Sequence, residues 1–194
     1  MLKVIYTSER SKAMECVEPI RNREKIETVK RILKKSGMRD FLLFLMGINI
    51  GLRISDILKL RVCDVSNREY IEIIEQKTGK YKRFPITNSF KGYLNEFIID
   101  KKPEEYLFTS QRGSNPITRI QAYRIINHAC QKAGINAHVG THTLRKTFGY
   151  HFYQEKKDVA LLQCIFNHSA PSVTLRYIGI NQDIIDSNLH SFAL

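Results

Sequence analysis

The apolar residues recur every three or four positions over most of the chain, a spacing typical of helices that turn one face to a core. This period predicts helices over 19–35, about 39–50, 88–100, 117–133 and 157–166, a further helix after Gly140, and a short helix that begins within 53–60; a short segment of unassigned structure holds Tyr177. Gly37 and Gly51 are placed to end the first two helices. The apolar run FLLFLMGINIGL (41–52) is too short to cross a bilayer, so it predicts a buried helix.

The hydrophobic period changes to that of β-strands between residues 69 and 86. The segments EYIEII (69–74) and YKRFPI (81–86) are rich in β-branched and aromatic residues and flank the polar stretch EQKTGK, so they predict a β-hairpin with Gly79 in its turn. We find no internal repeat and no low-complexity segment, and we expect a single core. The predicted fold class is therefore mixed, mainly α with a small antiparallel β-sheet.

The two ends of the chain are expected to lie outside this domain. The predicted division is an N-terminal arm over 1–18, one domain over 19–180, and an amphipathic C-terminal helix over 181–194 with Ile184, Ile185, Leu189 and Phe192 on its apolar face. A chain of 194 residues is long enough for one such domain with a substantial core.

The composition is that of a globular protein with an excess of positive charge. Hydrophobic residues make up 43% of the chain and charged residues 26%. Lys and Arg outnumber Asp and Glu by 31 to 19, which gives a formal net charge of +12. Such an excess favours polyanionic partners, nucleic acid first and an anionic membrane surface second. The net charge alone fits equally well a basic protein that is soluble but binds no polyanion.

Signals for metals, cofactors and export are missing from the sequence. The four cysteines form no CxxC pair, and the six histidines supply no HExxH or Cys-His spacing, so we expect reduced thiols and no metal site. There is no Walker loop for nucleotide binding and no apolar segment of a signal peptide at the N-terminus. We therefore predict a cytoplasmic protein without a cofactor.

The stretch HTLRKTFGYHF (142–152) places a charge beside an apolar stripe. Leu144 and Phe148 continue the stripe of a helix, while His142 and Arg145 are neighbours on its flank. A guanidinium is strongly disfavoured in a core unless an anion meets it there. The segment therefore predicts an anion close to Arg145.

A second arginine, Arg53 in GLRISDILKL, is expected on the same helical face as Asp56 and Leu60. An Arg53–Asp56 pair three positions apart can be a simple surface interaction. Arg53 and Arg145 together, however, offer the two planar guanidinium groups that suit the non-bridging oxygens of a phosphate diester.

The segment NHSAPSVTLRYIGI (167–180) supplies candidate reacting groups. His168 lies in an expected turn, and Tyr177 follows nine residues later. A tyrosine is commonly a residue at the edge of a core, and its hydroxyl is a poor nucleophile unless nearby cations favour the phenolate. Two arginines and histidines would supply such cations.

Taken together, these sequence motifs resemble those of the catalytic domain of the tyrosine recombinases, the phage integrase family of site-specific DNA recombinases. The resemblance rests on ordered motifs from about residue 20 to the C-terminus: Gly51, Leu52, Arg53, Ser55 and Asp56, then a lysine in a hairpin turn, then His142, Leu144 and Arg145, then His168, and Tyr177 nine residues on. It implies an integrase-type catalytic core.

The hairpin lysine has more than one candidate, and the chain departs from the family pattern in the turn at His168 and at its N-terminus. QKTGKYKRFPI matches the family's hairpin pattern and favours Lys77, with Lys80 and Lys82 as alternates. Phe166-Asn167-His168 stands where the family usually has Leu-Gly-His, and asparagine tolerates the left-handed conformation that glycine supplies. About twenty residues precede the domain, so we expect no N-terminal core-binding domain of the kind that full-length members carry.

The resemblance implies a function for each candidate residue. Tyr177 would attack the scissile phosphate to give a 3′-phosphotyrosyl intermediate, with Arg53, Arg145 and His168 on the phosphate oxygens. Lys77 would act as general acid, His142 would assist proton transfer, and Asp56 would support Arg53. The implied partners are double-stranded DNA and, on synapsed DNA, a homo-tetramer of a chain that can be monomeric when free, with no membrane and no metal or ATP. The resemblance also implies that the C-terminal helix over 181–194 docks onto a neighbouring protomer in that tetramer, with folding back onto its own domain as the alternative.

Two other functions are compatible with the same residues. A type IB topoisomerase-like enzyme uses this chemistry to relax DNA, and a DNA-binding regulator can descend from a recombinase without catalysis. The close spacing of the boxes favours a recombinase over the first, and the presence of Tyr177 argues against the second. An origin in a bacterium, a phage or a mobile element is expected, and the DNA target cannot be read from the sequence.

Overall fold

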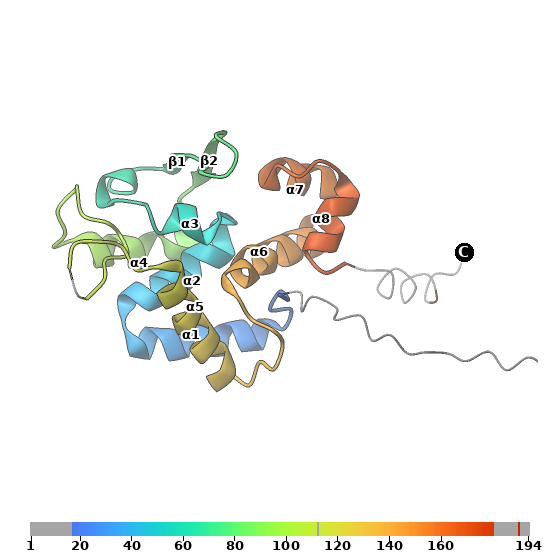
Figure 1. The fold of residues 1–194 in the computed structure, drawn as a ribbon, viewed down its shortest axis with the longest axis horizontal. Coiled ribbons are helices and arrows are strands. Elements are labelled where there is room, and N and C mark those ends of the chain that lie inside the picture. Colours follow the sequence, from blue (N-terminus) through green and yellow to red (C-terminus); the bar gives the residue numbers. More distant parts are fainter. Residues whose placement is uncertain (1–16, 112, 181–189, 191–194) are drawn as a thin grey trace, which may run out of the picture.

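The fold is mainly helical with a two-stranded antiparallel sheet, as the sequence predicts (Figure 1). A computed structural model describes residues 17–111, 113–180 and 190. The predicted arm, except for its last two residues, and the predicted C-terminal helix, except for residue 190, lie outside this described part. Within the described residues, no helix combines the length and the apolar character needed to cross a membrane.

The first two helices lie where the apolar period predicts them. α1 (Arg23–Ser36) begins four residues later than expected, because the side chain of Asn22 caps it by accepting a hydrogen bond from the backbone amide of Lys25 at 3.0 Å. Gly37 separates α1 from α2 (Met38–Ile50), and Gly51 ends α2 in the left-handed conformation at φ 61°. α2 is buried along most of its length, which confirms the prediction for this apolar run.

One local prediction in this region is wrong. Arg53 does not share a helical face with Asp56, because it is the extended residue (φ −70°, ψ 145°) immediately before the short helix α3 (Ile54–Ile57). The left-handed turn at Gly51 and the extended backbone at Arg53 turn the chain out of α2 before α3 begins. A short 3₁₀ helix, η1 (Val62–Asp64), then leads to the hairpin.

The hairpin consists of β1 (Tyr70–Ile74) and β2 (Tyr81–Pro85), paired so that Ile71 faces Phe84 across the strands. Gly79 lies in the connection with φ 65°, a conformation that glycine adopts without strain. The predicted hairpin and the glycine in its turn are therefore confirmed.

Five further helices follow in the described part of the chain: α4 (Asn88–Ile98), α5 (Arg119–Lys132), α6 (Thr141–Lys156), α7 (Val159–Phe166) and α8 (Pro171–Tyr177). α7 begins two residues later than predicted, since Lys157 is left-handed at φ 55° and Asp158 caps the new helix by accepting from the amide of Leu161. α8 is the short segment that ends at Tyr177, and it starts with Pro171 in its first turn.

The described residues form two hydrophobic clusters rather than the single core that the sequence led us to expect. The larger cluster, here the α2-centred core, packs α2 against α1, α3, α4 and α6. The smaller one is built from Leu162, Phe166, Ile178 and Ile180 and packs α7 and α8 against α6. Figure 1 shows α7 and α8 together at one side of α6, away from α1 and α5. α6 therefore joins both clusters.

Candidate active site

The residues that the sequence singles out lie on different elements but meet at one end of α6. Arg53, Lys77 and His142 line the same open hollow of about 720 Å³. His142 Nδ1 lies 3.3 Å from the hydroxyl of Tyr177, and the rings of Tyr177 and His168 are 5.0 Å apart between centroids. Their elements are the start of α3, the hairpin connection, the first turn of α6, the turn after α7 and the last residue of α8.

Arg145 is the buried centre of this group, with 3% of its surface exposed. Its Nη1 donates to the carbonyl of Gly51 at 2.7 Å, and its Nη2 donates to the carbonyl of Phe166 at 3.0 Å. The guanidinium also lies over the ring of Phe166, 4.4 Å from the centroid. These contacts fix the side chain between the end of α2 and the end of α7, and they leave further N–H donors of the guanidinium for an anion.

The anion that meets the arginines within the chain is the carboxylate of Glu75. Its Oε1 lies 2.6 Å from Arg53 Nη1 and 3.8 Å from Arg145 Nη1. Its Oε2 accepts hydrogen bonds from the hydroxyl of Thr78 at 2.8 Å and from the side-chain amide of Asn167 at 3.0 Å. Burial raises the pKa of Glu75, but the hydrogen bonds from Thr78 and Asn167 and the charges of both arginines outweigh it and lower the pKa, so Glu75 is ionised at neutral pH.

Sequence reasoning missed Glu75, although a signal for it exists. Ile71 is buried, Ile73 is half-buried, and Glu75 is 1% exposed, so the acid follows the inward-facing positions of the hairpin strand at intervals of two. A charged residue that continues an inward-facing register indicates a buried partner of opposite charge.

Asp56 lies close by in a different state. It is buried, and its Oδ1 accepts a hydrogen bond from the backbone amide of Gln76 at 3.2 Å. Its Oδ2 is buried without a hydrogen-bond partner in the described part of the chain. Burial raises the pKa of Asp56, and the charge of Glu75 adds to the rise. Arg53 forms its ion pair with Glu75, and the hydrogen bond of Asp56 holds Gln76 in the hairpin connection after β1.

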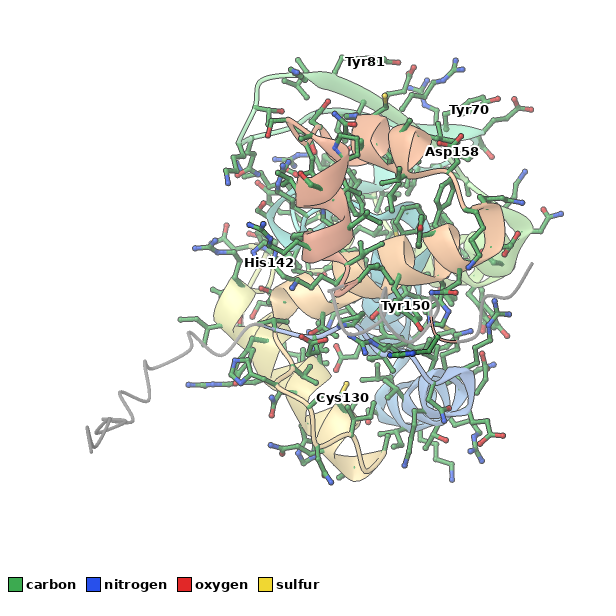
Figure 2. The ribbon with its side chains drawn as sticks, turned by 90° about the vertical axis from the view of Figure 1, so that its right-hand side faces the viewer. Tyr70, Tyr81, Cys130, His142, Tyr150 and Asp158 are labelled. Atoms are coloured by element: carbon green, nitrogen blue, oxygen red, sulfur yellow. The ribbon has the colours of Figure 1, made fainter. Side chains whose placement is uncertain are left out.

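Tyr177 is half-buried among rings and positive charge. Its ring packs edge-on against Phe166, with centroids 5.5 Å apart, and the ammonium of Lys146 lies 5.2 Å from its centroid. Figure 2 shows His142 at the start of α6, and the hydrogen-bond distance to Tyr177 puts the end of α8 beside it. Lys146 is a buried residue that sequence reasoning missed, although it directly follows Arg145.

Both histidines of the group are held toward the neutral form. Partial burial, then the charges of Arg145 and Lys146, lower the pKa of His142. Burial and the two arginines lower the pKa of His168 as well. His168 Nδ1 lies 3.0 Å from the hydroxyl of Thr174, which orients the ring. A neutral imidazole has one nitrogen that can accept a proton.

The three candidate lysines of the hairpin lie in different surroundings. Lys77 lines the hollow together with Arg53 and His142. Lys82 donates from Nζ to the carbonyl of Cys164 at 2.7 Å, on the side of α7, and burial lowers its pKa. Lys80 is exposed in the hairpin connection. Of the three, Lys77 is the one that shares the hollow with the other candidates.

The hollow has the composition of an anion-binding site. Lys59 and Arg119, which sequence reasoning did not single out, add their charges to those of Arg53 and Lys77 around it. No group of three or more His, Cys, Asp or Glu side chains that could hold a metal ion occurs among the described residues. The arrangement offers cationic donors for a phosphate group, a neutral histidine to accept a proton and a tyrosine hydroxyl within reach.

The chain belongs to the phage integrase family, whose pattern matches residues 22–183. One relative is the probable integrase/recombinase YoeC of Bacillus subtilis (strain 168), 53% identical over 170 residues that cover 88% of this chain and 93% of YoeC. A tyrosine recombinase of Pseudothermotoga lettingae is 32% identical over 157 residues, which cover 78% of this chain and 54% of that protein. This chain thus matches nearly the whole of the first relative but only about half of the second.

Solved structures of recombinases share the fold. A crystal structure of the XerA recombinase superposes with a TM-score of 0.74 at 19% identity, covering 100% of this chain and 70% of XerA. The XerH site-specific recombinase, bound to palindromic difH substrate in a post-cleavage complex, gives a TM-score of 0.72 at 21% identity and covers 97% of this chain and 57% of XerH. The predicted integrase-type catalytic fold is confirmed.

Proposed function

We propose that this chain is a site-specific DNA recombinase that cleaves and rejoins DNA strands through a 3′-phosphotyrosyl intermediate on Tyr177. Family membership supports strand exchange as the reaction class. The observation that carries the proposal is the surroundings of the Tyr177 hydroxyl, which lies 3.3 Å from His142 Nδ1 beside a cluster of buried positive charge. Nearby cations favour the phenolate over the phenol and so make this oxygen a better nucleophile.

The proposed cleavage step uses residues that line the hollow and others that lie next to them. Arg53 and Arg145 bind the non-bridging oxygens of the scissile phosphate and stabilise the additional charge of the transition state. The Tyr177 oxygen forms a bond to phosphorus, and the bond from phosphorus to the 5′-oxygen breaks. His142 accepts the phenol proton, and Lys77 gives a proton to the leaving 5′-oxygen. His168, in the turn before α8, also binds the non-bridging oxygens of the phosphate.

Rejoining reverses the same step. The 5′-hydroxyl of a second strand gives its proton to Lys77 and its oxygen attacks phosphorus. The bond from phosphorus to the Tyr177 oxygen breaks, and His142 returns a proton to that oxygen. One phosphate diester is exchanged for another, so the proposed cycle consumes no ATP. The donors that stabilise phosphate charge in this scheme are side chains of the chain itself, namely the arginines, Lys77 and His168.

The proposed partner is double-stranded DNA, bound largely through its phosphates. A net charge of +12 and the additional cations Lys59 and Arg119 at the hollow support this partner. We assign catalysis to the domain over 19–180, and we propose that a tetramer forms on synapsed DNA from chains that are monomeric when free. The chain matches only about half of the P. lettingae recombinase. That this chain carries out the complete recombination reaction is therefore also part of the proposal.

The test is a covalent-trapping assay with the 194-residue chain and a pool of labelled duplexes that carry a nick and randomised flanking sequence. Cleavage beside the nick releases a short fragment with a 5′-hydroxyl, so the protein–DNA adduct accumulates and survives denaturation. We expect an adduct with the wild type and none above background with Tyr177→Phe. Tyr153→Phe is the matched control, because Tyr153 is also half-buried beside the smaller cluster, and it should leave the adduct unchanged.

An adduct that persists in Tyr177→Phe, or a wild type that forms none, contradicts the proposal. Sequences recovered from the adduct then provide a defined substrate. Two copies of that substrate on one plasmid separate strand exchange, which gives recombinant products, from topoisomerase-like activity, which only relaxes supercoils.

A further inference from the structure

The side chains that carry the candidate chemistry come from segments far apart in the sequence, and one partly buried contact connects two of these segments. The Asn167 amide donates to Glu75 Oε2 at 3.0 Å across 92 positions of sequence. Glu75 lies at the end of the hairpin strand, two residues before Lys77, and Asn167 directly precedes His168. The contact therefore connects the hairpin with the turn between α7 and α8.

The same carboxylate also holds an arginine. One oxygen of Glu75 pairs with Arg53 at 2.6 Å, and the other accepts from Thr78 and Asn167. Because both oxygens are used and the side chain has no exposed surface, a phosphate in the hollow would bind Arg53, which lines it, without displacing the carboxylate. Glu75 is thus placed to orient the arginines and not to touch DNA.

The backbone conformation of Asn167 does not by itself require an asparagine side chain. It ends α7 in the left-handed conformation (φ 54°, ψ 44°), which glycine adopts at least as easily. Glycine would satisfy the backbone at this position but would leave Oε2 of Glu75 without this donor. The asparagine therefore contributes a bond that the turn itself does not require.

We propose that Glu75 and Asn167 are paired positioning residues, which hold Arg53 in place and keep the turn that carries His168 against the hairpin that carries Lys77. This inference rests on the proposed function, because its consequence is measured as DNA cleavage. It predicts that loss of the contact slows the chemical step at saturating DNA more than it weakens DNA binding.

The first test compares Asn167→Gly with the wild type in single-turnover adduct formation, with the duplex recovered from the pool assay as the probe. We expect the cleavage rate at saturating DNA to fall about 10-fold, the size of effect associated with one hydrogen bond to a charged group. The dissociation constant for the duplex should change by less than about 2-fold, since the phosphate-binding cations are untouched. Asn67→Gly is the matched control, because Asn67 is also left-handed (φ 55°) but is exposed in the loop before β1.

Asn167→Asp gives a readout that a purely structural role would not produce. At neutral pH it sets a carboxylate against that of Glu75, and like charges should slow cleavage more than the glycine does. Protonation of the new acid restores a donor, so the rate of this variant relative to wild type should rise as the pH is lowered. Asn167→Gly, which has no titrating group there, should show no such recovery.

Glu75→Gln extends the test to the acid and should slow cleavage by about 100-fold, because it removes the charge that both arginines face. Its fold is checked by thermal unfolding, and the Asn167 variants keep the inference testable if this buried substitution prevents folding. A wild type without a Tyr177-dependent adduct overturns the proposed function. An adduct that forms at the wild-type rate in Asn167→Gly and Asn167→Asp overturns the role of the pair alone.

Discussion

The α2-centred core and the pair of helices α7 and α8 differ in how firmly they are built, although both pack on α6. The first surrounds α2 with four other helices and contains most of the buried apolar residues of the described chain. The second has four buried residues in a cluster completed by half-buried rings. Since stability grows with buried apolar area, the first region carries most of the folding free energy.

The side chains to which we propose catalytic roles are divided between these two regions. Arg53 and Glu75 lie on the side of the larger core. His168 and Tyr177 lie in the turn after α7 and at the end of α8, and Arg145 of α6 lies between the two groups. The arginine and glutamate side of the candidate site is therefore held by the core that contributes most to folding. The proposed nucleophile depends on the weaker attachment. Substitutions should therefore separate stability from activity according to the region they affect.

Arg145→Ala should have the largest effect, because this side chain belongs to both regions. It leaves the carbonyls of Gly51 and Phe166 without their donor and removes one of the two arginines that face Glu75. Breaking a buried charge pair typically costs about 3–5 kcal/mol. We expect the free energy of unfolding in urea to fall by about this amount, together with loss of adduct formation.

Arg145→Lys sharpens that result. The ammonium keeps the charge but cannot donate to both carbonyls in the planar geometry of the guanidinium, so it should recover only part of the lost stability. If Arg145→Ala unfolds at the wild-type urea concentration, the two regions are not coupled through this residue.

Two glycines of α6 and its neighbour test each interface separately. A Cβ on Gly149 would lie 2.7 Å from the Phe166 ring and from Ile178, whereas a Cβ on Gly47 of α2 would overlap Leu144 Cδ1 and lie 3.0 Å from Leu144 Cβ. Overpacking costs about 1–3 kcal/mol, and alanine recovers roughly 1 kcal/mol of helix propensity over glycine. Gly149→Ala should loosen α7 and α8 with little global unfolding, and Gly47→Ala should lower global stability.

Amide hydrogen exchange distinguishes the two glycine variants. Protection should fall in α7 and α8 for Gly149→Ala and in α2 for Gly47→Ala. Cleavage activity should be lost in the first variant at temperatures where its α2 amides remain protected. Equal loss of protection in both regions would mean that the smaller cluster does not open independently.

The smallest expected effect is the dependence of stability on pH. The folded state lowers the pKa values of His142 and His168, so it disfavours their protonation, and stability should decline as the pH falls below about 6.5, the ordinary histidine value. The lowered pKa of Glu75 adds a second decline below about 4.5. The raised pKa of Asp56 acts in the opposite direction and offsets part of this second decline.

Thermal unfolding between pH 8 and pH 5 checks the histidine contribution. The double variant His142→Gln and His168→Gln should unfold at a temperature that depends less on pH than that of the wild type. An unchanged dependence would locate the titrating groups elsewhere in the chain.

Most of the fold could be predicted because the hydrophobic period records which face of each element is buried. The apolar run of α2 and the alternation around Gly79 each predicted the correct element. Helix starts were less accurate, since they depend on caps such as Asn22 and Asp158, whose contribution is one local hydrogen bond. The second cluster was not predicted, because periodicity shows that a face is buried and not what covers it.

The candidate site was only partly predictable. The position of Arg145 beside an apolar stripe correctly required an anion, but the nearest anion is Glu75, 70 positions earlier, and spacing on one helix cannot reveal a partner in a hairpin. Asn167 was recognised for its backbone conformation, while its side-chain bond depends on the same distant residue. Both omissions concern contacts between segments that meet only in three dimensions.

Because the smaller cluster packs α7 and α8 together, Asn167, His168 and Tyr177 would move as one unit. If α7 and α8 tilt away from α6, all three side chains withdraw at once, while the cationic hollow beneath stays formed. Under the proposed function, a chain in that state would still bind DNA phosphates but could not cleave the strand, so DNA binding and cleavage would be separable within one polypeptide.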